Sequence, residues 1–95
     1  MSVLEVAHLT IKEGESERFA DLFANASRYI RDAEGCLKVD WHPSVEHADH
    51  FLLLVEWRSL EDHVERFVSS PEFAQFQDAI SDLLAEAPVV EHFHL

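Results

Sequence analysis

The chain has few of the residues that indicate linkers, disulfides or binding to polyanions. It contains two glycines, three prolines and a single cysteine, Cys36, among 95 residues. So few glycines exclude a glycine-rich phosphate loop, and one cysteine forms neither an internal disulfide nor a Cys-x-x-Cys motif. Seven lysines and arginines are outnumbered by 19 aspartates and glutamates, which gives a formal charge of −12. This charge repels nucleic acids and anionic membranes, so we expect neither as a partner.

The amino-terminal segment carries no signal that would direct the chain into or across a membrane. Its first residues, MSVLEVAHLTIKEGE, have no basic segment and no long apolar run. We therefore expect a cytoplasmic protein. A hydrophobic content of 47 %, with two tryptophans, one tyrosine and seven phenylalanines, excludes disorder. We expect one domain over residues 1–95, with a thin core because a chain of this size buries only about 60 % of its surface.

The spacing of the apolar residues predicts four strands and two helical regions. Strand-like alternation covers residues 3–11, 36–42, 51–57 and 89–95. Helical spacing covers residues 19–30 and a second region from 60 to 84, in which Ser59 and then Ser70 with Pro71 are typical of helix starts. The order β-α-β-β-α-β predicts an α+β, ferredoxin-like fold, an antiparallel sheet with helices on one face.

Alternation along the strands also predicts which side chains the helices cover. This set is nearly all apolar: Ala7, Leu9, Leu37, Val39, Trp41, Leu53, Val55, Trp57 and Phe93. Glu5 is the lone acid on this side of the first strand. The opposite face mixes aliphatic with polar residues: Leu4, Val6, Leu52, Leu54, Val90, His8, Asp40, His42, Glu56, His92 and His94. An uncovered face this apolar predicts a homodimer through the sheet face, whose four histidines would gain charge below about pH 6.

Three polar residues, Tyr29, His63 and Gln77, lie on or beside the apolar stripes of the predicted helices. Under helices that cover the sheet, they converge with Trp57 on the space between the layers, together with Phe23, Phe73 and Phe76. An apolar cavity with a few polar groups is typical of a small-molecule site, and we expect an aromatic ligand. Two alternatives stay open: His63 and Gln77 reach solvent at the stripe edges, or the phenylalanines fill the space and Trp57 anchors the core.

The histidines do not form a metal-binding motif. His42, His47 and His50 crowd one predicted loop, but no HExxH, CxxC or dense carboxylate pattern accompanies them. We therefore expect no metal site. The lysines and arginines show no cluster in the sequence that would bind a phosphate.

Several short motifs resemble the antibiotic biosynthesis monooxygenase family. They are EGC-L at Glu34 to Leu37, VEW at Val55 to Trp57, and SPEFAQF at Ser70 to Phe76. The resemblance runs over nearly the whole chain. It implies a dimeric α+β barrel in which two ferredoxin-like protomers pack sheet against sheet. Members of the family include cofactor-independent monooxygenases, haem-degrading enzymes and an isomerase of a phosphorylated signalling sugar.

Not every branch of the family is equally compatible with this sequence. The resemblance implies that Trp57 lines the cavity, as the matching tryptophan does in the haem-degrading branch. That branch also requires an asparagine where this chain has Ala7 and a haem-ligating histidine where it has Gln77. Both differences argue against haem degradation.

The resulting hypothesis is an enzyme that oxidises an aromatic phenol or quinol with O₂ and uses no cofactor. Trp57 would stack on the ring, His63 or Tyr29 would handle the proton, and Gln77 would donate to the oxyanion, since such chemistry needs only a dry cavity, a base and a donor. Phe23, Phe73 and Phe76 would hold the substrate. The alternatives are a catalytically silent binding or stress-associated module and an isomerase of a small sugar phosphate.

Overall fold

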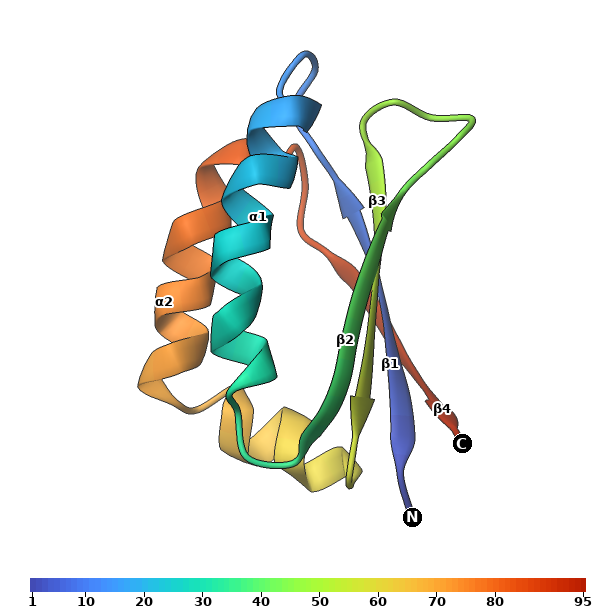
Figure 1. Cartoon of the computed structure of the whole chain (residues 1–95), viewed down its shortest axis with the longest axis vertical. Helices are drawn as coiled ribbons and strands as arrows, with labels where there is room; N and C mark the ends of the chain where they lie inside the picture. Colours follow the sequence, from blue (N-terminus) through green and yellow to red (C-terminus); the bar gives the residue numbers. More distant parts are fainter.

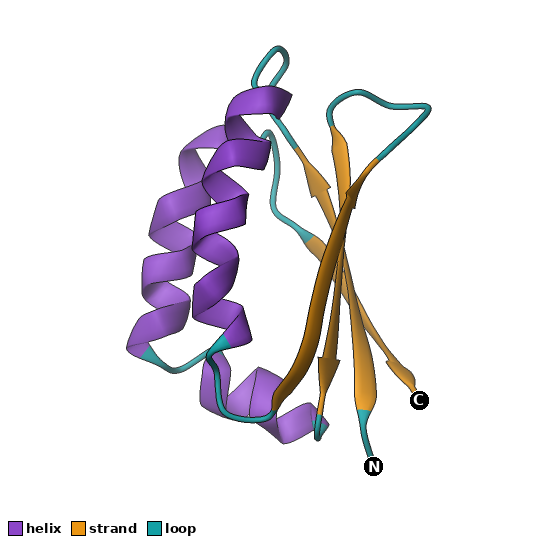
Figure 2. Ribbon diagram, viewed as in Figure 1, coloured by secondary structure: helices purple, strands orange, loops and turns teal.

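The computed structural model describes all 95 residues, which fold into one four-stranded antiparallel sheet with helices on one face. The strands are β1 (Val3–Thr10), β2 (Cys36–Pro43), β3 (His50–Trp57) and β4 (Val89–His94), arranged in the order β2-β3-β1-β4. The helices α1 (Ser16–Arg31) and α2 (Pro71–Ile80) lie on the same side of the sheet, and its other face is open (Figures 1 and 2). The predicted ferredoxin-like fold is confirmed.

Two short helical segments flank α2. A π-helix, η1 (Asp62–Phe67), follows β3, and a 3₁₀ turn, η2 (Ser81–Leu83), ends the second helical region. As the sequence predicts, Ser70 caps α2: its Oγ accepts a hydrogen bond from the Phe73 N–H at 3.2 Å, and Pro71 occupies the first turn. No helix in the structure is both long enough and apolar enough to cross a membrane.

The core lies between the sheet and the helices and combines aliphatic with aromatic side chains. Phe19, Phe23, Val55 and Trp57 have no exposed surface. Phe23 packs edge-on against both Trp41 and Phe76, which joins α1 to the sheet and to α2. Each fully buried side chain of this kind contributes about 1.5–3 kcal/mol relative to its exposed state.

The prediction for the two faces of β4 was reversed. The pairing of β1 with β4 sets Ala7 opposite Val90 and Glu5 opposite His92, so Val90, His92 and His94 lie on the helix side. Phe93 pairs with Leu4 on the open face, where it is 46 % exposed. In this short edge strand, apolar residues occur among the side chains of both faces. Hydrophobicity alone therefore does not determine which side chains face the helices. Two of the four histidines predicted for the open face therefore lie on the helix side, where His92 is half-buried and His94 is exposed.

Two further predictions of buried positions were wrong. A register shift between Cys36 and Lys38 turns Leu37 outward, where it is 59 % exposed. In the segment after β3, helical spacing in the sequence predicts four apolar positions, Leu60, Val64, Phe67 and Val68. Phe67 is buried as predicted, together with Asp62 and His63, whereas Leu60, Val64 and Val68 are 40 %, 43 % and 41 % exposed. The π-helical winding of η1 and the ion pairs of Asp62 determine which side chains of this segment face inward. The spacing of its apolar residues does not.

Candidate active site

Trp57 ends β3 in the middle of a buried polar cluster. Its indole N–H donates to Oε1 of Glu5 at 2.9 Å, and the imidazole of His63 stacks on the indole with ring centroids 5.0 Å apart. Phe67 packs on the same indole at 5.5 Å. The ring is thus enclosed by protein atoms, and its N–H fixes the position of the Glu5 carboxyl group.

Glu5 is an acidic residue whose side chain faces the helices from the buried face of β1. It lies in the middle of β1, paired with Val55 on β3 and with His92 on β4, and only 6 % of it is exposed. Burial raises the pKa of its carboxyl group to about 7, although the hydrogen bond from Trp57 acts in the opposite direction. Near neutral pH this group can therefore both take up and release a proton.

His63 connects Glu5 to His92. Its Nε2 lies 3.3 Å from Oε1 of Glu5, and its Nδ1 lies 2.8 Å from Nε2 of His92. Burial lowers the pKa of His63 to about 4, with a smaller contribution from His92. At neutral pH the imidazole is uncharged and carries one N–H, which points either to Glu5 or to His92. The chain from Glu5 through His63 to His92 is therefore able to relay a proton.

This relay forms part of the wall of a cavity of about 710 Å³ between the sheet and the second helical region. Glu5, His63 and His92 all line it. Oε2 of Glu5 has no hydrogen-bond partner, and no buried side-chain oxygen or nitrogen in the protein lacks one, so Oε2 reaches open space. The remaining wall is mostly apolar and includes Leu9, Leu53, Phe73, Phe76, Ile80 and Val90. This combination matches the usual composition of a small-molecule site.

The structure brings some of the residues predicted for the site to this cavity and leaves others elsewhere. His63, Phe73, Phe76 and Gln77 line it. Trp57 lies behind the relay and Phe23 lies in the core; neither has exposed surface.

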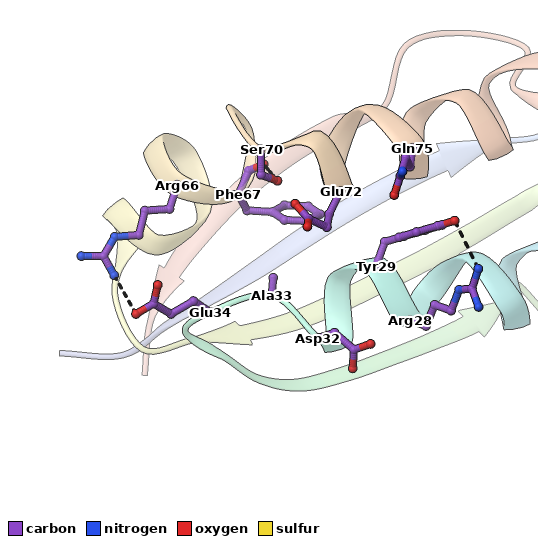
Figure 3. Close-up of a pocket in the computed structure, with 10 residues that line it drawn as sticks. All are labelled: Arg28, Tyr29, Asp32, Ala33, Glu34, Arg66, Phe67, Ser70, Glu72 and Gln75. Carbon is purple, nitrogen blue, oxygen red and sulfur yellow. Dashed lines mark hydrogen bonds and ion pairs between the residues drawn. The ribbon is translucent and has the colours of Figure 1, made fainter.

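Tyr29 lines a separate outer groove near the carboxyl end of α1 and the start of α2, and its hydroxyl accepts a hydrogen bond from Arg28 at 3.3 Å (Figure 3). The structure therefore does not bring Tyr29 together with Trp57 and His63. Its predicted role in proton transfer has no support from its position.

The sequence contained a signal for Glu5 but none for His92. Glu5 was the single charged residue in an otherwise apolar inward set, and a buried acid of this kind is a frequent mark of function. His92 was assigned to the wrong face because the phase of β4 was reversed.

One other polar cluster, outside the cavity, has its charges paired. No group of three or more histidine, cysteine, aspartate or glutamate side chains is arranged to hold a metal ion. Arg58 and Arg66 each pair with Asp62, four residues away, and both reach Glu34, which is distant in the sequence. Their positive charges are thus neutralised outside the cavity.

Comparisons with known proteins identify the fold and the family. Residues 2–79 match the family described as antibiotic biosynthesis monooxygenase. A solved Bordetella bronchiseptica protein that carries this family name is 26 % identical, with a TM-score of 0.94 over 99 % of this chain and 96 % of that one.

Two more distant structures share the fold. A point variant of SnoaB, a cofactor-independent oxygenase from Streptomyces nogalater, is 16 % identical with a TM-score of 0.83 over 99 % of this chain and 92 % of its own. A conserved protein from Methanosarcina mazei is 17 % identical with a TM-score of 0.84 over the same shares. No match was found among curated protein sequences. Because the family match spans 78 of the 95 residues, the chain belongs to the antibiotic biosynthesis monooxygenase family.

Proposed function

We propose that the protein oxidises an aromatic phenol or quinol-type molecule with O₂ and without a cofactor. The observation that carries the proposal is the hydrogen-bonded chain of Glu5, His63 and His92 along the wall of an apolar cavity. Membership of the family supports the same reaction class. In such a reaction the deprotonated substrate supplies the electrons, so the protein must supply a base, a dry cavity and a donor for the oxyanion.

Glu5 is the base in this proposal. Its Oε2 takes a proton from the activated carbon of the substrate. The carboxyl group then releases a proton from Oε1, which lies 3.3 Å from Nε2 of His63, while Nδ1 of His63 passes its own proton to Nε2 of His92. A carboxylate with a pKa near 7 is a stronger base than an ordinary one and is still ionised at mildly alkaline pH. Trp57 acts as a positioning residue, because it holds Oε1 and leaves Oε2 free.

The electrons then move from the substrate anion to oxygen. One electron transfer and radical recombination join O₂ to the carbon as a peroxide, and loss of water leaves a carbonyl group. For a CH₂ carbon the balance is CH₂ plus O₂ giving C=O plus H₂O, with one oxygen atom in each product. Gln77 lines the cavity and supplies an amide N–H for the developing oxyanion.

Oxygen uptake with a panel of hydroquinones and anthrone-like phenols tests the proposal. We expect uptake above the uncatalysed rate, with kcat/KM rising with pH through about 7 as Glu5 loses its proton. Glu5→Gln should lower kcat/KM about a hundredfold and remove this dependence. Trp57→Phe should shift the midpoint to higher pH, because the indole N–H stabilises the ionised carboxylate.

The matched control is Glu13→Gln, which makes the same change at an exposed acid in the turn after β1. It should leave both the rate and the pH profile unchanged. Retained ligand without oxygen uptake would contradict the proposal and favour the silent binding module.

We also propose that two copies pack through the open sheet face. That face presents Leu4, Val6, Leu52 and Leu54 as half-buried side chains, next to Phe93, which is 46 % exposed. Contiguous apolar surface of this kind is usually covered by a partner.

Sedimentation velocity should give twice the 10.9-kDa mass of one chain, and Leu54→Glu should halve it. The control Val45→Glu introduces the same charge in the loop between β2 and β3, where Val45 is 93 % exposed, and should leave the dimer intact. A monomeric parent protein would contradict this proposal.

A further inference from the structure

The charged residues that line the cavity are all of one sign. Three carboxylates contribute to its wall: Glu5 from β1, Asp78 from α2 and Glu86 from the segment before β4. None of the seven lysines and arginines of the chain lines it. An anion that enters the cavity therefore loses part of its hydration and meets no compensating positive charge.

Asp78 and Glu86 stand where the cavity meets solvent. Both residues are exposed, whereas Glu5 is deeply buried. Glu86 is held in place because its Oε1 accepts a hydrogen bond from the Thr10 hydroxyl at 3.0 Å. Two acids beside an apolar cavity, in a protein with a charge of −12, concentrate negative potential at its entrance.

We propose that this cavity selects neutral or cationic aromatic molecules and rejects carboxylates and phosphates, with Asp78 and Glu86 as the residues that set the selectivity. The aromatic nature of the ligand rests on the function proposed above, and its charge rests on the residues that line the cavity. The apolar wall accommodates the rings, and an amino group on the ligand pairs with the acids at the entrance.

The proposed oxidation is compatible with this charge preference. The substrate anion forms only as the Glu5 carboxylate accepts the proton, so one negative charge appears as another disappears. The total charge inside the cavity stays constant during this step. A substrate that arrives with its own carboxylate would instead add a charge.

Equilibrium binding of three anthraquinones tests the selectivity apart from catalysis, because these ligands are already oxidised. The probes are anthraquinone, its 2-carboxylate and its 2-aminomethyl derivative, each titrated at pH 8 and low salt by quenching of tryptophan fluorescence. We expect the neutral and cationic probes to bind at least about tenfold more tightly than the carboxylate. Added salt should reduce the difference. Equal or tighter binding of the carboxylate, or binding of none of the three, would overturn the proposal.

Paired substitutions assign the effect to the two acids at the entrance. Asp78→Asn with Glu86→Gln should lower the ratio of the dissociation constants of the carboxylate and the neutral probe by about tenfold. The control pair, Asp82→Asn with Glu72→Gln, changes the net charge equally at exposed acids outside this cavity. It should leave this ratio of dissociation constants unchanged. The same ratio in both double variants would overturn the assignment of the selectivity to Asp78 and Glu86.

Failure of the charge selectivity can be distinguished from failure of the proposed oxidation. Charge-selective binding by a protein that takes up no oxygen with any phenol would contradict the oxidation alone. Oxygen uptake without charge selectivity would contradict this inference alone.

Discussion

Replacing Gly35 by alanine is expected to lower the free energy of unfolding by about 3 kcal/mol. Gly35 has a φ of +87°, a left-handed conformation that costs a residue with a Cβ about 1–2 kcal/mol. The added Cβ would also lie 2.4 Å from Cγ and Oδ2 of Asp62. Since that side chain cannot move freely, the substitution forces either the turn or the carboxylate out of place.

Asp62 cannot yield because three neighbouring residues hold its carboxylate. Arg58 donates to Oδ2 at 2.9 Å and to Oδ1 at 3.1 Å, Arg66 donates to Oδ1 at 2.9 Å, and the Ser59 hydroxyl donates to Oδ2 at 3.0 Å. These bonds lower the pKa of Asp62, chiefly through Arg58. Gly35 and Asp62 together join the turn before β2 to η1, the segment that carries His63.

Gly14→Ala is the matched control for this prediction. Gly14 has a φ of +79°, but a Cβ there would meet no atom within 4 Å, so only the backbone cost of about 1–2 kcal/mol remains. Urea unfolding at one protein concentration should therefore separate the two variants. Combining Gly35→Ala with Asp62→Ala should give a smaller loss than the sum of the two single changes. Equal losses for Gly35→Ala and Gly14→Ala would contradict the predicted clash.

Substituting Glu5 and His63 one at a time is expected to reveal two opposite pH dependences of the free energy of unfolding, each of about 3 kcal/mol. Folding raises the pKa of Glu5 from 4.5 to about 7, so the folded state holds this proton more tightly and loses stability as the pH rises through that interval. Folding lowers the pKa of His63 from 6.5 to about 4, so the folded state loses stability as the pH falls through that interval. Between about pH 4.5 and 6.5 the two effects nearly cancel in the parent protein.

Single substitutions remove one side of this balance. In Glu5→Gln only His63 remains, and stability relative to the parent should rise from pH 4.5 to 6.5. In His63→Gln only Glu5 remains, and relative stability should fall over the same range. Urea unfolding at pH 4.5, 5.5 and 6.5 measures both slopes. Parallel curves for the parent and both variants would show that folding does not shift these two pKa values in opposite directions.

The sequence was sufficient to predict the fold because its long elements have strong and consistent periodicity. The apolar alternation of β1 and β3 and the helical stripe of α1 are each long enough to fix the facing of their side chains. The start of α2 was equally clear, because Ser70 and Pro71 provide a cap with a defined geometry.

The sequence did not predict how the site is assembled. The neighbours of Glu5 come from β3, η1 and β4, and their convergence depends on strand register. The phase of β4 follows from its pairing with β1, and the facing of Leu37 follows from a bulge, both of which are decided by contacts distant in sequence. His63 faces inward because Asp62 and the π-helical winding hold η1 in place, which a search for apolar stripes does not detect.

The stacking of Trp57 on His63 gives the molecule an internal optical reporter. The rings lie 5.0 Å apart and only 13° from parallel, close enough for an imidazolium to quench indole emission by accepting an electron. The only other tryptophan, Trp41, packs edge-on against Phe23 and has no histidine ring stacked on it. The emission of Trp57 therefore depends on the charge of His63, and fluorescence from the core reports the protonation state of this member of the relay.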